Sequence, residues 1–371
     1  NIMKLKKILQ LGFKRSFQFL FKLFYGNIKF NQNLEIVKYL IRKKIINIKS
    51  DIKGTKDYYT YKIKNGRVYT DCVENVSIIS GKNLIGEVSY QQISGELKDP
   101  SNNIVLKKGT PSIKKRFNGQ VLTIVQGASG NTYGHWLLEM LPKIKMCSEH
   151  YPIKDINYLY TPTLEDYQKE SLSVLNIDEN MIIDSKKYKH IQADELLAVV
   201  HPSYHKGYIL EQFKFQPTWV IEWLRKTYLP YAKKFKANKK VFLDRRDSLH
   251  SHCQFQNEKE ISDYLINEKG FVKYQLTKLS FFEKIFLFNN AEIIFGAHSS
   301  GLMNLVFCKP QTKIIEVKPA FHPNTVSKRI SDINNLDYRL IETKKVRENK
   351  DNSGDIYLPM DELKNYLRGF I

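Results

Sequence analysis

Residues 291–307 read AEIIFGAHSSGLMNLVF and decide the fold of the C-terminal half of the chain. An apolar strand leads through a turn of small residues directly into a helix. The first backbone N–H groups of that helix are expected to point across the carboxyl edge of the strand, an arrangement that seats a phosphate. Ser299, Ser300 and Gly301 would allow close approach, and His298 would add a hydrogen-bond donor or a positive charge. A single turn of this kind more often caps a helix and binds nothing, so both interpretations stay open on this segment alone.

Strands and helices alternate strictly on both sides of this segment. Capping boxes are expected at Asn257 with Glu260 and at Ser280 with Glu283, each at the start of a helix. Such alternation is typical of parallel strands joined by right-handed crossovers, and it predicts a Rossmann-like sheet. The predicted strands are VFLD (241–244), FVKYQL (271–276), AEIIFG (291–296), KIIEV (313–317) and YRLIE (338–342).

The preceding part of the chain begins with a β-rich stretch at 52–120, where Asn65-Gly66 predicts a two-residue hairpin turn. Alternation of strands and helices resumes at Val121, and the polar stretch KANKK (236–240) predicts a domain boundary. The predicted fold class is therefore α/β, with two Rossmann-like domains facing a cleft, a β-rich lead-in and an N-terminal helix. The predicted divisions are 1–50, 51–235, 236–345 and 346–371, the last being a tail or helix.

The charge of the chain is concentrated at its N-terminal end. The 371 residues include 59 Lys and Arg against 38 Asp and Glu, a formal net charge of +21. Residues 1–50 hold 12 of the basic residues and a single acid, Glu35. Apolar residues in this segment recur at helical spacing, which predicts a basic amphipathic helix without the ~20 apolar residues that span a bilayer. Residues 1–30 would contact an anionic membrane surface, or pack on the protein's own core. Nucleic-acid binding is not expected, because no recognised motif accompanies the charge.

Cysteine and histidine spacings argue against disulfides and metal. The four cysteines lie far apart without a CxxC pair, which favours a reducing, cytoplasmic compartment. No DxD motif is present to hold a divalent cation on a nucleotide diphosphate. His201 with His205, His250, and His252 beside Cys253 could form a metal site on paper, but Pro202 keeps the first pair out of helical spacing. We therefore predict neither a metal nor another cofactor.

Charged side chains follow several predicted strands and could carry chemistry. Arg245 and Arg246 come directly after VFLD, and arginine forks match phosphate oxygens; solvation or pairing with Asp247 is the alternative. Glu316 could accept hydrogen bonds from both ribose hydroxyls, or form a salt bridge with Lys318.

In the segment GASGNTYGHWLLEMLPKI (127–144), His135 stands at the start of a helix and Glu139 follows four residues later on the same face. An imidazole oriented by a carboxylate is a general-base arrangement. A buried structural histidine is the alternative interpretation.

The order of these motifs resembles glycosyltransferase family 61. The resemblance rests on NTYGHWLLEMLPKI, FLDRRDS, NEKEISDYLINEKGF, LSFFEKIFLFNNAEIIFGAHSSGLMNLVF and KIIEVKP, and it covers about residues 121–320. It implies a GT-B fold, a nucleotide-sugar donor such as a UDP-sugar, and inverting transfer without an obligatory metal. The family includes enzymes of bacterial capsule and surface polysaccharide synthesis.

The resemblance also implies roles for particular positions. The family's His-Trp pair falls on His135 and Trp136, and its strand-end Arg falls on Arg245. Its glycine-rich stretch falls on His298, Ser299, Ser300, Gly301, Leu302 and Asn304, and its Glu falls on Glu316. The chain departs from the family pattern where Lys284 replaces Gln, where Ser299 replaces Gly, and where no Arg precedes Asn257; Lys284 or Arg246 would compensate.

These observations predict an inverting glycosyltransferase that works in the cytoplasm or at the inner face of the cell membrane, with a glycan or lipid-linked acceptor. Residues 51–235 are expected to present the acceptor, and residues 236–345 to bind the nucleotide sugar. His135 is the predicted base, Glu139 orients it, and Asp244 is the alternative base. Two other functions stay open: a non-catalytic protein that binds anionic membranes on a degenerate transferase fold, and a Rossmann-type oxidoreductase, which the absence of GxGxxG disfavours. The predicted donor-binding residues are Arg245, Arg246, Lys284, His298, Ser299, Ser300, Gly301, Asn304 and Glu316.

Overall fold

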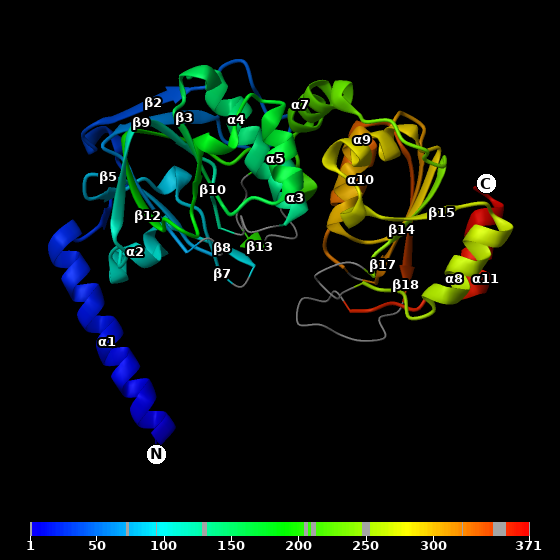
Figure 1. Cartoon of the computed structure of the whole chain (residues 1–371), viewed down its shortest axis with the longest axis horizontal. Helices are drawn as coiled ribbons and strands as arrows, with labels where there is room; N and C mark the ends of the chain where they lie inside the picture. Colours follow the sequence, from blue (N-terminus) through cyan, green and yellow to red (C-terminus); the bar gives the residue numbers. More distant parts are fainter. Residues whose placement is uncertain are drawn as a thin grey trace. The chain divides into compact units, whose positions relative to one another are not determined.

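The computed structural model forms two compact units (Figure 1), made of Asn1–Glu165 with Leu175–Gln212 and of Asp166–Val174 with Phe213–Ile371. Helix α5 (Asp166–Ser173) and helix α7 (Thr218–Tyr228) belong to the second unit, whereas the predicted boundary lies at 236–240. The structure describes residues 2–71, 74–93, 95–127, 132–203, 207–208, 213–246, 253–320, 322–343 and 354–370.

The first unit contains a ten-stranded sheet in which β2 to β6 pair antiparallel and the short end strand β1 runs parallel to β6. Strands β9 to β12 form a parallel part in the order β12-β9-β10-β11, and apolar side chains from both parts form a large core cluster, with a smaller cluster in addition. The strands are β1 (Lys29–Phe30), β2 (Leu40–Lys44), β3 (Tyr59–Lys64), β4 (Arg67–Thr70), β5 (Val76–Ser80), β6 (Asn83–Leu84), β9 (Lys114–Thr123), β10 (Tyr158–Thr161), β11 (Ile182–Asp184) and β12 (His190–Val199).

A second, small sheet and several helices complete the first unit. Strands β7 (Gln91–Ile93), β8 (Glu96–Lys98) and β13 (Gly207–Tyr208) form a separate small sheet. The helices are α1 (Ile2–Tyr25), α2 (Ile104–Lys108), α3 (Tyr133–His135), the π-helical turn η4 (Trp136–Met140) and α4 (Leu141–Ser148). The 3-10 turns are η1 (Leu34–Ile36), η2 (Gly86–Val88), η3 (Pro100–Asn102), η5 (Ile153–Asp155) and η6 (Glu179–Met181).

The predicted hairpin at Asn65-Gly66 is wrong. Strands β3 and β4 do not pair with each other; they lie end to end along β12, where Lys64 is opposite Glu195 and Arg67 is opposite Gln192. Asn65 adopts φ +52°, and a Cβ on Gly66 would lie 2.5 Å from Leu196 Cβ. The Asn-Gly pair therefore allows the chain to pass close to β12 and continue along it. A hairpin turn favours the same two residues, because it also needs positive φ and a residue without a Cβ.

The second unit contains a five-stranded sheet in which all strands are parallel, in the order β15-β14-β16-β17-β18. The α/β class and the predicted parallel strands are confirmed. Helices α8 and α11 lie together on one face, and α9 and α10 on the other (Figure 1). The strands are β14 (Lys240–Asp244), β15 (Val272–Gln275), β16 (Ile293–Ala297), β17 (Lys313–Pro319) and β18 (Asp337–Thr343). The helices are α8 (Glu258–Asp263), the π-helical turn η9 (Tyr264–Glu268), α9 (Phe281–Asn290), α10 (Val326–Ile333) and α11 (Met360–Arg368). The 3-10 turns are η7 (Phe213–Phe215), η8 (Leu229–Tyr231), η10 (Leu276–Lys278) and η11 (Ser300–Phe307).

The two predicted capping boxes have different outcomes. The Ser280 hydroxyl accepts the backbone N–H of Glu283, whose carboxylate accepts the N–H of Ser280, so this box is confirmed. Asn257 precedes α8, but its side chain makes no capping bond. Its amide instead donates to the Leu358 carbonyl oxygen and accepts the Leu358 N–H, which joins the C-terminal segment to the start of α8.

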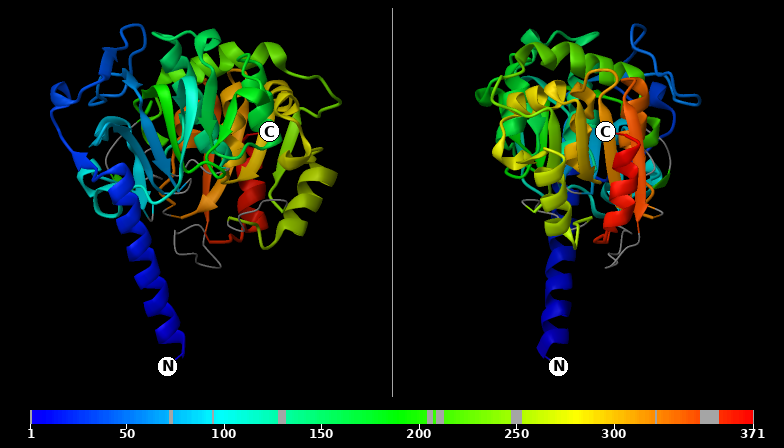
Figure 2. Two further views of the ribbon diagram at one scale, coloured as in Figure 1. Left: turned by 60° about the vertical axis from the view of Figure 1, so that its left-hand side comes forward. Right: turned by 90° about the vertical axis from the view of Figure 1, so that its right-hand side faces the viewer.

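Helix α1 is one unbroken helix (Figure 2), anchored at its C-terminal end. Lys22 Nζ donates to the Lys107 carbonyl oxygen, and the Tyr25 hydroxyl accepts the Lys114 N–H. Beyond this anchor, the side chains described from residue 10 onward are mostly exposed. Within the described residues, no helix combines the length and apolarity needed to cross a bilayer.

Candidate functional site

His135 and Glu139 lie at the carboxyl edge of the parallel part of the first sheet. They belong to consecutive helical turns after β9, and the π-helical turn η4 brings the Glu139 side chain into the protein interior. Pro142 has no N–H to offer the Leu138 carbonyl, so the regular helical ladder is interrupted at this point. Gln126 follows β9 and His201 follows β12, its neighbour in the sheet. The site therefore forms where adjacent parallel strands end, a common position for ligand sites.

Glu139 is fully buried, and three side chains surround one of its oxygens. The distances to Glu139 Oε2 are 2.7 Å from His135 Nδ1, 2.6 Å from Gln126 Nε2 and 3.3 Å from His201 Nε2. Glu139 Oε1 is buried and has no hydrogen-bond partner within the part of the chain that the structure describes. The structure thus brings together the predicted base and its orienting carboxylate, and adds two further side chains.

Hydrogen bonding determines which ring nitrogens carry protons. His201 Nδ1 accepts the Ser203 N–H at 3.1 Å, so the neutral ring carries its proton on Nε2, which lies 3.3 Å from Glu139 Oε2 and 3.2 Å from Gln126 Nε2. His135 faces the same carboxylate through Nδ1, which places its proton there and its basic lone pair on Nε2. His135 therefore has the tautomer that a general base requires.

The two histidines differ in pKa although they share one carboxylate. Burial disfavours the His135 imidazolium, but the charge and hydrogen bond of Glu139 outweigh it and raise the pKa of His135. For His201 the burial effect is the larger, and its pKa is lowered. Burial alone would raise the pKa of Glu139, yet the two histidines hold that pKa far below its usual range. Burial also lowers the pKa of Lys143, one helical turn further on, to about 7.

This site also contains Gln126, His201 and Lys143, which the sequence patterns did not assign to it. His201 was considered only as a metal ligand paired with His205, which lies outside the described residues together with His250, His252 and Asp247. The available signal was position, because His201 directly follows a predicted apolar strand. Within the described ranges, no group of three or more His, Cys, Asp or Glu is placed to hold a metal ion.

The second group of predicted residues lies at the carboxyl edge of the parallel sheet in the second unit. Strands β14 and β16 are neighbours there, and the strand order reverses between them, which is where open parallel sheets bind ligands. Arg245 follows β14 and donates from Nη1 to the carbonyl oxygen of His298, which follows β16. These two predicted residues are therefore in direct contact.

Glu316 lies inside β17 rather than at a strand end, because β17 continues to Pro319. Its Oε1 accepts from His298 Nδ1 at 2.5 Å and from the Ser327 hydroxyl at 3.2 Å, and its Oε2 accepts from the Tyr338 hydroxyl at 2.6 Å. The side chain is 2% exposed. Burial would raise the pKa of Glu316, but these partners lower it. In this arrangement Glu316 orients His298, whose ring also packs 4.4 Å from the ring of His322.

Asp244 and Arg246 are bonded to each other. Arg246 Nη2 donates to Asp244 Oδ2 at 2.8 Å, and Gln275 donates to the same oxygen at 3.1 Å. Burial would raise the pKa of Asp244, but its bonds to Arg246 lower it. A carboxylate so stabilised is a weak proton acceptor, which favours His135 over the alternative base.

The remaining predicted residues shape the loop before η11. Ser299 precedes η11 and is buried, whereas Ser300 is exposed. The buried Asn304 amide donates to the Gly301 carbonyl at 2.9 Å, and a Cβ on Gly301 would lie 2.7 Å from Leu276 Cδ1. Lys284 lies on α9, and its ammonium is 5.5 Å from the Tyr167 ring centre.

Comparison with protein families places part of the chain in a known family. The model of a family described as Glycosyltransferase 61 matches residues 133–315. The matched range contains both histidine sites, from His135 to His298, and ends one residue before Glu316. No curated protein matches the chain.

We predict that Glu139→Gln lowers the pKa of His135 below its ordinary value of about 6.5. The substitution removes the charge that offsets burial, so only the desolvation of the imidazolium remains. An NMR titration of the His135 Cε1–H signal measures this shift. The matched control is Glu149→Gln, at the end of the same helical segment, where the carboxylate pairs with Lys145. A His135 pKa that is equally high in both variants would contradict the assignment.

Proposed function

We propose that this chain, which belongs to glycosyltransferase family 61, transfers a sugar from a nucleotide-sugar donor to a hydroxyl group of a glycan acceptor. We further propose a GT-B arrangement, inversion at the anomeric carbon and no requirement for a metal ion. The observation that carries this proposal is the buried Glu139 carboxylate bonded to Nδ1 of His135 at 2.7 Å. It supports proton abstraction by the opposite nitrogen of the same ring.

In the proposed reaction, the acceptor hydroxyl oxygen attacks the anomeric carbon and its proton moves to His135 Nε2. The bond between that carbon and the diphosphate oxygen breaks, and the nucleoside diphosphate leaves with the electron pair. His135 gains a positive charge in this step, which the adjacent Glu139 carboxylate stabilises. Attack on the face opposite the leaving group inverts the configuration.

The leaving diphosphate is assigned to the carboxyl edge of the second sheet. Arg245, His298 and the backbone N–H groups of residues 299–301 would balance its charge. Glu316 is assigned the orientation of His298 in place of a ribose contact, because its two oxygens already accept three protein hydrogen bonds. Arg246 and Lys284 remain candidates for a supporting charge, and UDP is the proposed nucleotide. Synthesis of a bacterial capsule or surface polysaccharide is the proposed process.

We expect His135→Ala to lower turnover by roughly 10²–10⁴-fold, the usual contribution of a positioned general base. Glu139→Gln should also lower turnover and should move the acid limb of the kcat/KM profile to lower pH, because the pKa of the base falls. The measurement is release of nucleoside diphosphate from the donor sugar. His150→Ala is the matched control, because His150 bonds Thr60 away from this site. Equal turnover in His135→Ala and the control, with both variants folded, would refute the base assignment.

Nucleotide binding tests the second site separately. Saturating UDP should raise the thermal midpoint of the full chain by roughly 5 °C, since a ligand at 100-fold its Kd stabilises by about 2.7 kcal/mol. CMP, GDP, dTDP and NAD are the comparison ligands. Arg245→Ala should abolish the shift, whereas Arg339→Ala, a variant of the same sheet whose guanidinium lies over Phe370, should keep it. Stabilisation by NAD alone would favour an oxidoreductase instead.

A second proposal concerns location and is supported by α1. Phe13, Phe24 and Leu23 are 69%, 79% and 67% exposed, and the helix segment 2–25 contains six basic and no acidic residues. Exposed aromatic and basic residues on one helix favour insertion at an anionic lipid surface. We propose that α1 holds the enzyme at such a surface, close to lipid-linked acceptors.

We expect the chain to co-sediment with vesicles of phosphatidylcholine and phosphatidylglycerol, and less with phosphatidylcholine alone. Lys14→Gln with Arg15→Gln should weaken binding roughly tenfold or more, at about 1 kcal/mol per basic residue. Phe13→Ser with Phe24→Ser should weaken it on both vesicle types. Ile113→Ser is the matched control, because Ile113 is 81% exposed outside the helix. Binding that none of these substitutions alters would exclude α1 as the membrane contact.

A further inference from the structure

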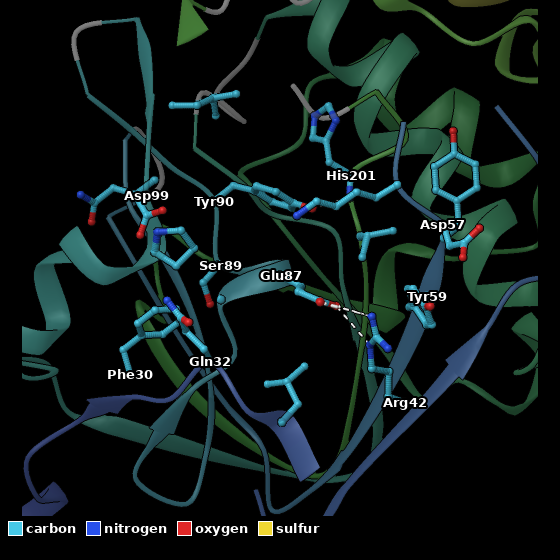
Figure 3. Close-up of a pocket in the computed structure, with 18 of the residues that line it drawn as sticks. Phe30, Gln32, Arg42, Asp57, Tyr59, Glu87, Ser89, Tyr90, Asp99 and His201 are labelled. Carbon is cyan, nitrogen blue, oxygen red and sulfur yellow. Dashed lines mark hydrogen bonds and ion pairs between the residues drawn. The ribbon is translucent and has the colours of Figure 1, made fainter. Parts of the chain in front are cut away.

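The first unit contains a pocket of about 510 Å³ (Figure 3), which the proposed reaction does not yet use. Its size is in the range of about 300–1,000 Å³ that is usual for small-molecule sites. Its walls come from the antiparallel end of the sheet, from η2 and from the segment around Asp99. His201 lines it, together with Tyr90 and Val200.

The pocket has no net formal charge. Its described lining contains three basic residues and three acidic ones, Arg42, Lys56, Lys98, Asp57, Glu87 and Asp99. Arg42 Nη2 is 3.0 Å from Glu87 Oε2, as the dashed lines in Figure 3 mark, and the guanidinium lies 3.3 Å from the Tyr59 ring centre. Asp57 pairs with Lys44 at 2.6 Å. The lowered pKa of His201 leaves that ring neutral near pH 7. A phosphate or carboxylate would therefore find Arg42 and Lys98 already paired with carboxylates, those of Glu87 and Glu96.

Aromatic and amide side chains make up much of the remaining lining. Phe30 and Tyr59 are half-buried, so each ring retains some accessible surface. Gln32 is exposed, and its amide can both donate and accept hydrogen bonds. Aromatic surface next to amides and carboxylates suits a ring that has apolar C–H faces and a rim of hydroxyl groups. A neutral sugar has this chemistry.

His201 connects the pocket to the proposed base. The Tyr90 hydroxyl accepts the His201 backbone N–H at 2.6 Å, and the two rings pack edge to face with centres 5.4 Å apart. His201 Nε2 is 3.3 Å from the Glu139 oxygen that also holds His135. The pocket wall and the proposed base therefore share one carboxylate.

We infer that this pocket binds an uncharged sugar unit of the acceptor glycan. The inference rests on the proposed transfer reaction, because it identifies the bound sugar as part of the acceptor. Glu87 sets the preference for an uncharged ring, since it neutralises Arg42 at the pocket wall.

Calorimetric titration of the full chain with maltose, lactose and cellobiose, and with methyl glucuronide as the anionic probe, tests this inference. We expect at least one neutral disaccharide to bind and methyl glucuronide to bind more than tenfold more weakly. Glu87→Gln leaves Arg42 without its compensating charge, so it should tighten methyl glucuronide binding by about tenfold and weaken the neutral sugar. Glu87 is 41% exposed in its side chain, so the substitution should not prevent folding. Glu179→Gln, which removes an exposed carboxylate of η6 that does not line this pocket, should change neither affinity.

Three results would overturn the inference: binding of none of the neutral sugars at millimolar concentration, tighter binding of methyl glucuronide by the unaltered chain, or an unchanged preference in Glu87→Gln. The UDP-induced rise in thermal midpoint separates this failure from that of the proposed function. A chain that UDP stabilises but that binds no sugar loses the pocket assignment and keeps the transfer reaction. A chain that binds the sugar without responding to any nucleotide keeps the pocket and loses the reaction.

Discussion

The buried charge of Glu139 is the constraint on which the site in the first unit depends. A carboxylate without access to water must be compensated by hydrogen bonds or opposite charge. Here the compensation comes from three places, namely the residues after β9, the helical turn that contains His135 and the residue after β12. One carboxylate therefore ties two strand ends to a helix. It also sets the tautomer of His135, so a structural requirement produces the orientation that a base needs.

Each unit contains a carboxylate bonded to an imidazole, yet the two pairs are not equivalent. Both oxygens of Glu316 accept protein hydrogen bonds, and such a satisfied network holds its members rigidly. Glu139 leaves Oε1 without a partner among the described residues, so its site retains capacity for one more donor. The Glu316 pair is therefore suited to holding His298 in place for a static ligand contact. The Glu139 pair is suited to a histidine whose charge changes during a reaction.

The sequence predicted correctly those features that depend on residues close together in the chain. The parallel strands of the second unit follow from alternating apolar segments, and the pairing of His135 with Glu139 follows from a spacing of four residues. The features that were predicted wrongly or missed depend on contacts between residues far apart in the sequence. Asn65-Gly66 borders β12, Asn257 bonds Leu358 and makes no capping bond to its helix, and His201 reaches Glu139 only because β12 lies beside β9. The Asn-Gly sequence is the same whether the pair forms a hairpin turn or, as here, joins two strands that both pair with β12.

The basic residues of the chain fall into two groups, those paired or buried in the folded units and those in the N-terminal segment. Several basic groups in the pocket and the two sites are compensated: Arg42 pairs with Glu87, Arg246 pairs with Asp244, and burial lowers the pKa of Lys143. Where the charges are paired in this way, the choice of ligand depends on hydrogen-bond geometry and on the shape of the site. About half of the net charge of +21 lies instead in the N-terminal 50 residues, which carry 12 basic residues and one acid. The proposed attraction to an anionic surface would therefore come from α1 and its neighbourhood, and chemistry within the sites would be left to groups whose charge is locally controlled.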